Sequence, residues 1–426
     1  MISSGRLWGV VRDNPGFRRL CAANAVSQLG DWLNVVALFS LLIELTGKGE
    51  SVALVLVTRL LPAFFVGPAA GVLADRISRR AILVVCDLTR AGLVLCLLFV
   101  RKPEHAPLAY GVMALHSLAS AFFEPAQAAL VPNLVPRQDL LVAVTLENSL
   151  WSAALALGAA LGGAVLALAG RDAAFVLDAA SFIASALFLR GLPELRAKAD
   201  RAALQIDEEA RGPEAVGGAN LLGLRDLREG ARYVAGNADV RALLIVKASF
   251  GFTLGGVLVL LAFFGEKVFA LAGGTGIALL WTARGLGSLA GPFVAWRMGG
   301  ESEPALRRGI AAANATILVS YLAFSLSPSI WPAALALAVA NAGGSILWTH
   351  GSTLLQLIVP DHVRGRVAAA EMGGMTLAMS LSTLVVGRLI DRGVQPRALM
   401  AGCGLIAALP LAFWVLRKRS PAAERS

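Results

Sequence analysis

Ionisable side chains stand inside long runs of apolar residues in this chain. Asp31 lies in "SQLGDWLN" and Arg59 lies in "VTRLLPAF". An apolar environment favours the protonated form of a carboxyl group, whereas a nearby arginine favours the ionised form, so a partner that moves can load and unload a proton. Such groups are costly within apolar segments and usually face a cavity or a partner. The predicted proton-coupling candidates are Asp31, Glu124, Arg59 and Arg90.

Asp31 and Arg59 are predicted to lie at a similar depth in their helices. Asp31 falls about 14 residues into the first apolar segment and Arg59 about 15 residues before the end of the second, so each lies ~21–22 Å from the same surface. An ion pair between them is therefore geometrically possible. Asp87 and Arg90 share a helix face and are predicted to be a structural pair. A static charge network that fixes helix packing is the alternative role for these groups.

Polar and aromatic side chains accompany the ionisable groups. Sites for apolar ligands are lined by aromatic and aliphatic side chains, with a few polar groups that orient the ligand. Tryptophans beside polar residues are the best candidates for such a lining. A packing role is the alternative for His350, although imidazole titrates near neutral pH. The predicted substrate-cavity residues are Gln28, Trp32, Asn34, Asn148, Trp151, Trp348 and His350.

The composition indicates that the surroundings of these residues are a lipid bilayer. Of the 426 residues, 57% are hydrophobic and only 15% are charged, whereas a soluble domain carries about a quarter charged residues. Windows of about 20 mostly apolar residues, enough to span a bilayer as a helix, recur about twelve times. The net charge of +10 sits in short loops between these windows, which argues against nucleic-acid binding. The predicted spans are 17–43, 51–74, 80–100, 106–131, 139–169, 173–190, 240–264, 271–298, 306–327, 330–358, 366–388 and 396–416.

The two halves of the chain resemble copies of one six-helix unit. The Gly-Pro pair at position 67 recurs at 291, and the Val-Pro pair at 135 recurs at 359, with one common offset. Parallel repeats of this kind describe a large class of secondary transporters. Most of the 38 Lys and Arg residues fall on one side if both termini are cytoplasmic, which sets the orientation. The predicted domains are an N-terminal bundle 1–190, a cytoplasmic linker 191–239 and a C-terminal bundle 240–426.

The stretch "GVLADRISRR" forms a short charged loop between the second and third predicted spans. Its carboxylate follows a helix end, within reach of the arginines or of a neighbouring helix end. A charge pair there can latch one packing of the helices and release it in another. For the arginines alone, the preference of cationic residues for cytoplasmic loops is the alternative explanation. The predicted latch residues are Gly71, Asp75, Arg76, Arg79 and Arg80.

This loop resembles the signature of the major facilitator superfamily, roughly Gly-x-Leu-Ala-Asp-Arg-x-Gly-Arg-Arg/Lys, with Ser78 in place of its glycine. The stretches "TRLLPAFFVGPAAGVLADR", "FFEPAQAALVPNLVP" and "LLQLIVPDHVRGRVAA" resemble the branch that holds the enterobactin exporter and macrolide efflux proteins. In the fifth span, "LGAALGGAV" is similar to the family's antiporter motif, but Ala159 stands at the position where the family usually has proline.

The resemblance implies an all-α membrane protein with twelve transmembrane helices in two pseudo-symmetric six-helix bundles. It implies a secondary active transporter that exports a small, partly hydrophobic molecule of the drug or siderophore class by proton antiport and alternating access. The implied partners are this substrate, protons and the lipid bilayer. We expect a monomer in the bacterial cytoplasmic (inner) membrane, with both termini in the cytoplasm. Open alternatives are a lipid or lysolipid transporter, an importer, and a non-transporting membrane sensor or scaffold.

Sequence patterns typical of enzymes do not occur in this chain. It has no P-loop, no His-Glu-x-x-His motif, no paired-cysteine metal site and no Gly-x-Ser-x-Gly elbow. The glycines of "RGLGSLAG" lie within a predicted span, where helix packing explains them. We therefore expect no enzymatic activity, no cofactor and no metal.

Overall fold

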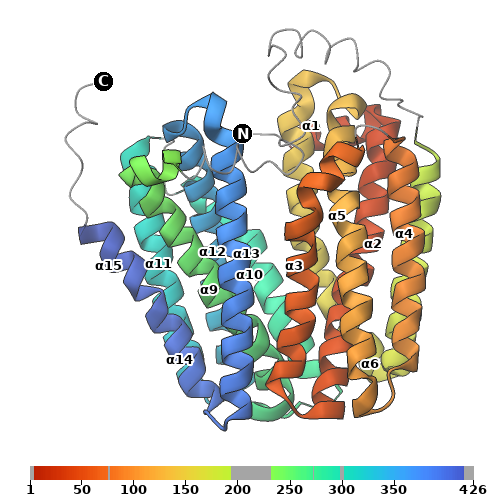
Figure 1. The fold of residues 1–426 in the computed structure, drawn as a ribbon, viewed down its shortest axis with the longest axis vertical. Coiled ribbons are helices and arrows are strands. Elements are labelled where there is room, and N and C mark those ends of the chain that lie inside the picture. The colour runs from red at the N-terminus through yellow and green to blue at the C-terminus, as the bar shows by residue number, and fades with distance from the viewer. Residues whose placement is uncertain (1–3, 75–76, 193–231, 272, 298–301, 417–426) are drawn as a thin grey trace. The chain divides into compact units, whose positions relative to one another are not determined.

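The structure is a computed structural model that describes residues 4–74, 77–192, 232–271, 273–297 and 302–416 (Figure 1). Within these ranges the chain is helical and contains no strand. The helices of the first half of the chain are α1 (Ser4–Asp13), α2 (Pro15–Thr46), α3 (Gly49–Ala74), α4 (Arg79–Cys96), α5 (Ala106–Leu134) and α6 (Leu140–Arg190). Those of the second half are α9 (Ala238–Phe263), α10 (Thr275–Arg297), α11 (Glu303–Leu326), α12 (Ile330–Ile358), α13 (Asp361–Asp391), α14 (Pro396–Ile406) and α15 (Ala408–Leu416). Short helical turns, η1 (Leu97–Phe99), η2 (Pro103–His105), η3 (Arg137–Asp139) and the π-helical η6 (Phe264–Val268), lie between them.

Among the described residues, eleven helical segments are long and apolar enough to cross a membrane. The longest, Arg137–Arg190, contains both the fifth and the sixth predicted spans. Its helix α6 is kinked at Gly170, where φ is 77° and ψ is 177°. Dividing this segment at the kink gives twelve spans, so the expected all-α membrane architecture is confirmed.

The kink at Gly170 depends on a backbone conformation that is essentially reserved for glycine. Gly170→Ala is expected to cost about 1–3 kcal/mol of stability, because a Cβ is strained in this region of φ and ψ. An added Cβ at Gly170 meets no atom within 4 Å, so backbone strain rather than a clash is the cause. The melting temperature in detergent measures this effect. Gly92→Ala on α4 is the control, because it also adds a Cβ in open space. Equal melting temperatures of the two variants would contradict the explanation.

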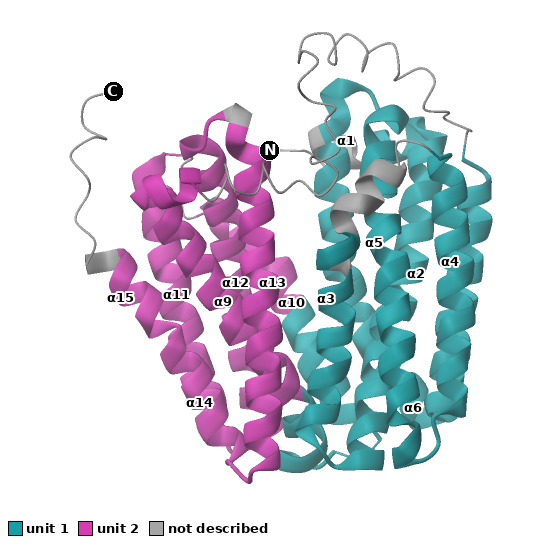
Figure 2. Ribbon diagram, in the orientation of Figure 1, with its two compact units in different colours: residues 1–227, 262–285 teal, residues 228–261, 286–426 magenta. Residues whose placement is uncertain are grey.

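The chain forms two compact units, shown in different colours in Figure 2. The first unit comprises residues 1–227 and 262–285, and the second comprises 228–261 and 286–426. The end of α9, the turn η6 and the beginning of α10 thus belong to the first unit, although they come from the second half of the chain. Most of the predicted linker, 191–239, lies outside the described residues, so its boundaries stay a prediction.

In the first unit, helices α2 and α6 pack with their backbones close together because α6 carries glycine at the contact. A Cβ added to Gly158 would lie 2.8 Å from both the Leu29 carbonyl oxygen and Trp32 Cβ. A Cβ added to Gly162 would lie 3.0 Å from Leu33 Cα. Small residues four apart allow this close approach in membrane helices. The contact fixes the face of α2 that carries the polar residues described below.

Gly158→Leu is expected to destabilise the first unit, because the leucine side chain has no space between α2 and α6. Overpacking of a filled interior costs about 1–3 kcal/mol, and here the obstructing atoms include backbone. The yield of monodisperse protein on size-exclusion chromatography checks the effect. Gly92→Leu is the matched control, because nothing lies within 4 Å of that position. A normal yield of Gly158→Leu would show that the two helices separate easily.

The segment 262–285 contacts the rest of the first unit through a hydrogen bond and a cluster of aromatic rings. Ser40 Oγ donates to Glu266 Oε1 over 2.8 Å. The Trp281 ring packs against Trp32 and Phe39, with centroid distances of 5.6 and 5.8 Å. These contacts place the Trp281 ring beside the middle of α2.

The second unit is organised by close contacts of α9 with α13. A Cβ added to Gly251 would lie 2.5 Å from Met375 Cγ, and one added to Gly255 would overlap the Met379 carbonyl. At the beginning of α9, Asp239 pairs with Arg307 of α11 over 3.2 Å. The backbones of α9 and α13 therefore nearly touch at the level of the two glycines.

Candidate functional site

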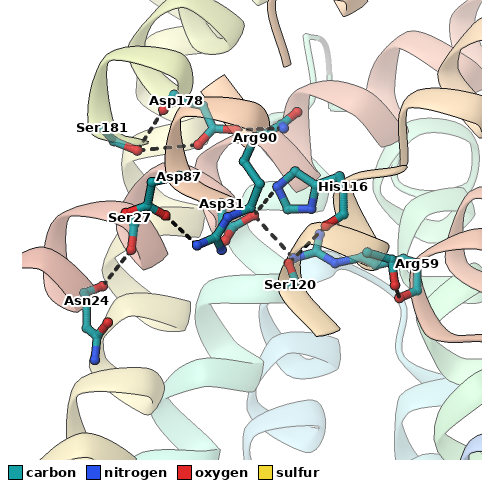
Figure 3. Close-up of polar contacts among 12 residues, drawn as sticks. Asn24, Ser27, Asp31, Arg59, Asp87, Arg90, His116, Ser120, Asp178 and Ser181 are labelled. Atoms are coloured by element: carbon teal, nitrogen blue, oxygen red, sulfur yellow. Dashed lines mark hydrogen bonds and ion pairs between the residues drawn. The ribbon is translucent and has the colours of Figure 1, made fainter. Parts of the chain in front are cut away.

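Polar and ionisable side chains from helices α2, α3, α4, α5 and α6 meet inside the first unit (Figure 3). A charge within a membrane segment is costly unless it is paired or faces a cavity, so such a group is a functional-site hypothesis. The group, called the polar network below, consists of Asn24, Ser27, Asp31, Asn34, Arg59, Asp87, Arg90, His116, Asp178 and Ser181.

The contribution of α2 is a stripe of polar residues along one helical face. Asn24, Ser27, Asp31 and Asn34 follow one another at three- or four-residue spacing, which is the spacing of one face. Asn24, Ser27 and Asn34 are buried, at 3 to 4% exposure. The glycine contacts of α6 hold α2 in this orientation, so the stripe faces the interior of the unit.

Asp31 is the centre of the polar network. Its Oδ1 atom lies 3.6 Å from Arg59 Nη2 and 3.5 Å from His116 Nε2. Both Asp31 Oδ1 and His116 Nε2 are buried, and neither makes a hydrogen bond within the described part of the chain. The carboxylate thus faces one permanent cation and one imidazole at distances just beyond ordinary hydrogen bonding.

Contacts with neighbouring helices hold the two partners of Asp31 in place. Ser117 Oγ donates to the Arg59 carbonyl over 2.7 Å, which joins α5 to α3. The His116 ring packs edge-on against Phe182 of α6 at 5.6 Å, and its carbonyl accepts a hydrogen bond from Ser120 Oγ at 3.1 Å. Arg59 also lies 5.7 Å from the Trp32 ring.

A second, tighter ion pair lies on α4 within the polar network. Arg90 donates to Asp87 Oδ1, three residues earlier on the same helix. Both side chains are buried, and the Arg90 guanidinium lies 4.2 Å from the Phe123 ring and 4.8 Å from the Phe182 ring. The shared helix face expected for this pair is therefore observed, and two aromatic rings lie close to the cation.

Asp178 is the most enclosed acid of the polar network. It has no exposed surface and accepts a 2.7 Å hydrogen bond from Asn34 Nδ2. Ser181 Oγ lies 3.4 Å from Asp178 Oδ1, and a Cβ added to Gly30 would lie 2.5 Å from the same oxygen. This acid therefore rests against the backbone of α2 and joins α6 to the polar stripe.

The chemistry available at Asp31 differs from that at the other two acids. Asp87 Oδ1 accepts from Arg90 and Asp178 Oδ2 accepts from Asn34, although Asp87 Oδ2 makes no hydrogen bond within the described residues. Asp31 Oδ1 has two nitrogens nearby but is bound to neither. A movement of roughly half an ångström would convert either contact into a hydrogen bond. This carboxyl group can therefore exchange a proton without breaking an established hydrogen bond of Oδ1.

Other predicted residues of the first unit have varied surroundings. Gln28 has a buried Oε1 atom that makes no hydrogen bond within the described residues. Trp32 and Trp151 pack edge to face, with centroids 5.7 Å apart. Asn148 and Glu124 are exposed, and the Glu124 carboxylate interacts electrostatically with Arg90, Asp31 and Arg59 of the polar network. These positions stay predictions as substrate or proton sites.

The predicted cavity residues of the second unit lie near a second buried ion pair. Trp348 covers the Lys247 ammonium at 4.7 Å, and Lys247 pairs with Glu371 of α13. His350 is buried, and its ring would meet a Cβ added to Gly309 of α11. Its Nδ1 atom makes no hydrogen bond within the described residues, and its role in a substrate cavity stays a prediction.

The predicted latch lies only partly within the described residues. Asp75 and Arg76 lie outside them, and Gly71 falls within α3. Arg79 donates to the Ala129 carbonyl of α5, and Arg80 donates to the Leu192 carbonyl, each over 3.0 Å. The latch itself therefore stays a prediction.

His116 is the functional candidate that the sequence analysis missed. It stands in "VMALHSLAS", inside the fourth predicted span, and is 3% exposed in the structure. The rule that polar residues at membrane depth are function-biased would have identified it. Its relation to Asp31 could not be found in this way, because the two residues come from helices far apart in the sequence.

The twelve-span helical fold and the ionisable residues buried in its membrane-spanning region define a multi-pass membrane transporter of the major facilitator type. The chain belongs to the transmembrane secretion effector family of this superfamily, whose pattern matches residues 11–425. This membership confirms the family resemblance of the charged loop, and it indicates a transporter rather than an enzyme.

Comparisons with individual proteins agree with the family. The chain is 28% identical over 412 residues to the uncharacterized MFS-type transporter YkuC of Bacillus subtilis (strain 168), covering 95% of this chain and 92% of YkuC. It is 31% identical over 138 residues to macrolide efflux protein A of Streptococcus pyogenes, covering 32% of this chain and 34% of that protein. Among solved structures, the nucleoside transporter NupG (D323A mutant) matches 94% of this chain and 98% of its own, with a TM-score of 0.69 and 16% identity. The likeness to NupG shows the fold alone.

Proposed function

We propose that this transporter exports a small, partly hydrophobic molecule of the drug or siderophore class in exchange for protons, by alternating access. The observation that carries the proposal is the position of Asp31 Oδ1, buried between Arg59 and His116 without a hydrogen bond. The partial likeness to macrolide efflux protein A supports the export direction. The family supports the transport activity itself.

In the proposed cycle, a proton that enters from outside binds the Asp31 carboxylate. Neutral Asp31 no longer attracts the Arg59 guanidinium, so the contact between α2 and α3 weakens. His116, on α5, lies 3.5 Å from the same carboxylate oxygen, so its ring nitrogen can accept a hydrogen bond from the protonated carboxyl group. Release of the proton to the cytoplasm restores the charge and the original packing. The change in charge thus biases two arrangements of the helices, as alternating access requires.

The setting that we propose follows the distribution of charge. The chain resides in the bacterial cytoplasmic membrane with both termini in the cytoplasm, because this orientation places most Lys and Arg residues inside. The loop with Gly71, Asp75 and Arg76 then faces the cytoplasm and acts as the latch. The unit of function is a monomer, because one chain of this fold forms a complete pathway.

Everted membrane vesicles test the proposed function. The lumen is acidified by respiration, and an acridine dye reports the pH gradient by its quenched fluorescence. A panel of macrolides, tetracyclines, cationic dyes and siderophores is then added. We expect at least one compound to release the quench in vesicles with the transporter and not in vesicles without it. If labelled compounds accumulate while the quench never changes, proton antiport is wrong.

A further inference from the structure

A cavity of about 220 Å³ opens between α9 and α13 within the second unit. Apolar side chains of α9 form one wall, and small residues of α13 form the other. Two charged side chains also line it. The lining residues are Val234, Arg241, Leu244, Ile245, Ala248, Ala370, Glu371 and Gly374.

The cavity exists because the two helices are close at one level and have small residues at the next. Gly251 of α9 lies against Met375 of α13, so the backbones nearly touch there. One turn away, Ala248 faces Ala370 and Gly374, which leave the space unfilled. A Cβ added to Gly374 would meet no atom within 4 Å. The small side chains at these positions therefore leave the cavity open.

The charges around the cavity have a net positive balance. Lys247 is only 1% exposed, and its ammonium contacts Glu371, Ser352 Oγ at 2.8 Å and the Trp348 ring. Lys247 therefore neutralises the Glu371 carboxylate. Arg241, which also lines the cavity, is exposed, donates to the Ala235 carbonyl and has no acidic partner within the described part of the chain. Its guanidinium is the uncompensated charge.

We propose that this cavity binds an anionic amphiphile, with its carboxylate or phosphate group on Arg241 and its apolar part on Leu244, Ile245 and Ala248. Guanidinium groups hold such anions through paired hydrogen bonds. The inference rests on the proposed function, because it assigns a substrate class to the transporter.

The volume and charge of the cavity select among ligand classes. About 220 Å³ holds an acidic group with a short apolar portion, while a longer ligand extends out of the cavity. An amphiphilic cation would meet the Arg241 guanidinium, and its contact with Glu371 would compete with the ion pair that Lys247 already makes. Uncharged ligands would leave Arg241 without an anion. The same chemistry occurs in an exported acid and in the acidic head of a membrane lipid.

The test is ligand binding to the full-length protein in phosphatidylcholine nanodiscs, measured by calorimetry. The probes are decyl phosphate, decanoate, decyltrimethylammonium and decanol. We expect the two anions to bind and the cation and the alcohol to bind at least about tenfold more weakly, the usual scale for a charge-assisted hydrogen bond. Stronger binding of the cation than of the anions would overturn the proposal.

Three variants locate the binding. Arg241→Gln is expected to weaken decyl phosphate binding by about tenfold through loss of the charged donor. Gly374→Leu is expected to abolish it, because the new side chain fills the cavity without a backbone clash. Arg308→Gln is the matched control on α11, where the arginine is exposed and does not line the cavity. Equal affinity of all three variants would place the anion elsewhere and overturn the proposal.

Two further comparisons separate the source of the ligand from the transport activity. If phosphatidylglycerol in the nanodisc competes with decyl phosphate, a lipid head group is the natural occupant; if it does not, an exported acid is. Either result supports the shared anion chemistry. This binding needs no proton gradient, so binding without proton coupling would contradict the proposed function alone. Proton-coupled transport without anion binding would contradict this inference alone.

Discussion

Asp31→Asn is expected to abolish proton-driven transport while the protein remains folded. Asparagine has almost the shape of aspartate but cannot carry the coupling proton. The Oδ1 atom of Asp31 makes no hydrogen bond within the described residues, so the substitution breaks none at this atom. The measurement is the release of dye quench by a transported compound in everted vesicles. We expect the rate to fall to that of vesicles without the transporter.

Two comparisons make the Asp31 result specific. Asp172→Asn is the matched control, because it changes the same chemical group at a half-exposed position of the first unit, where Asp172 pairs with Arg101 at 2.7 Å. It should transport normally. Exchange of labelled for unlabelled substrate, without a proton gradient, should survive in Asp31→Asn. Normal proton-driven transport by Asp31→Asn would remove Asp31 from the coupling mechanism.

Arg90→Met is expected to destabilise the protein more than any other change considered above. The substitution leaves Asp87, which has no exposed surface, without its cationic partner. Breaking one side of a buried ion pair costs about 3–5 kcal/mol. The contacts of the guanidinium with the Phe123 and Phe182 rings are also lost. The melting temperature in detergent should fall clearly.

The double variant Arg90→Met/Asp87→Leu distinguishes a structural pair from a coupling pair. Removing both charges should restore most of the lost stability, because apolar residues of similar volume often replace a buried ion pair without penalty. Transport by the double variant then decides the role of Arg90. Retained proton coupling identifies a structural pair, whereas a stable but inactive double variant shows that Arg90 takes part in coupling.

Much of the fold could be predicted from the length and apolarity of the segments. Two predicted spans form one helical segment because only a few residues separate them. The chain changes direction between these spans at the Gly170 kink. The grouping of residues 262–285 with the first unit could not be predicted. It depends on the aromatic contacts of Trp281 with Trp32 and Phe39, which no pattern within one segment reveals.

The candidate site shows a similar division. Depth alone placed Asp31 and Arg59 at one level, and the two side chains lie 3.6 Å apart. The depth of a residue along its helix does not say which face of α5 points toward α2, so the contact of His116 with Asp31 could not be predicted. Nor could it pair Lys247 with Glu371, because that pair depends on the packing of α9 against α13 at Gly251 and Gly255. Local spacing finds charges on one helix, and tertiary packing decides which charges on different helices meet.

The most direct test of the central claim is proton movement by the purified protein in liposomes. A pH-sensitive dye is enclosed in the lumen, and a compound identified with the everted vesicles is supplied in a gradient without any imposed pH difference. Proton antiport predicts that movement of the compound in one direction drives protons in the other, so the luminal pH changes and an ionophore for protons abolishes the change. Movement of the compound with a constant luminal pH would contradict the account.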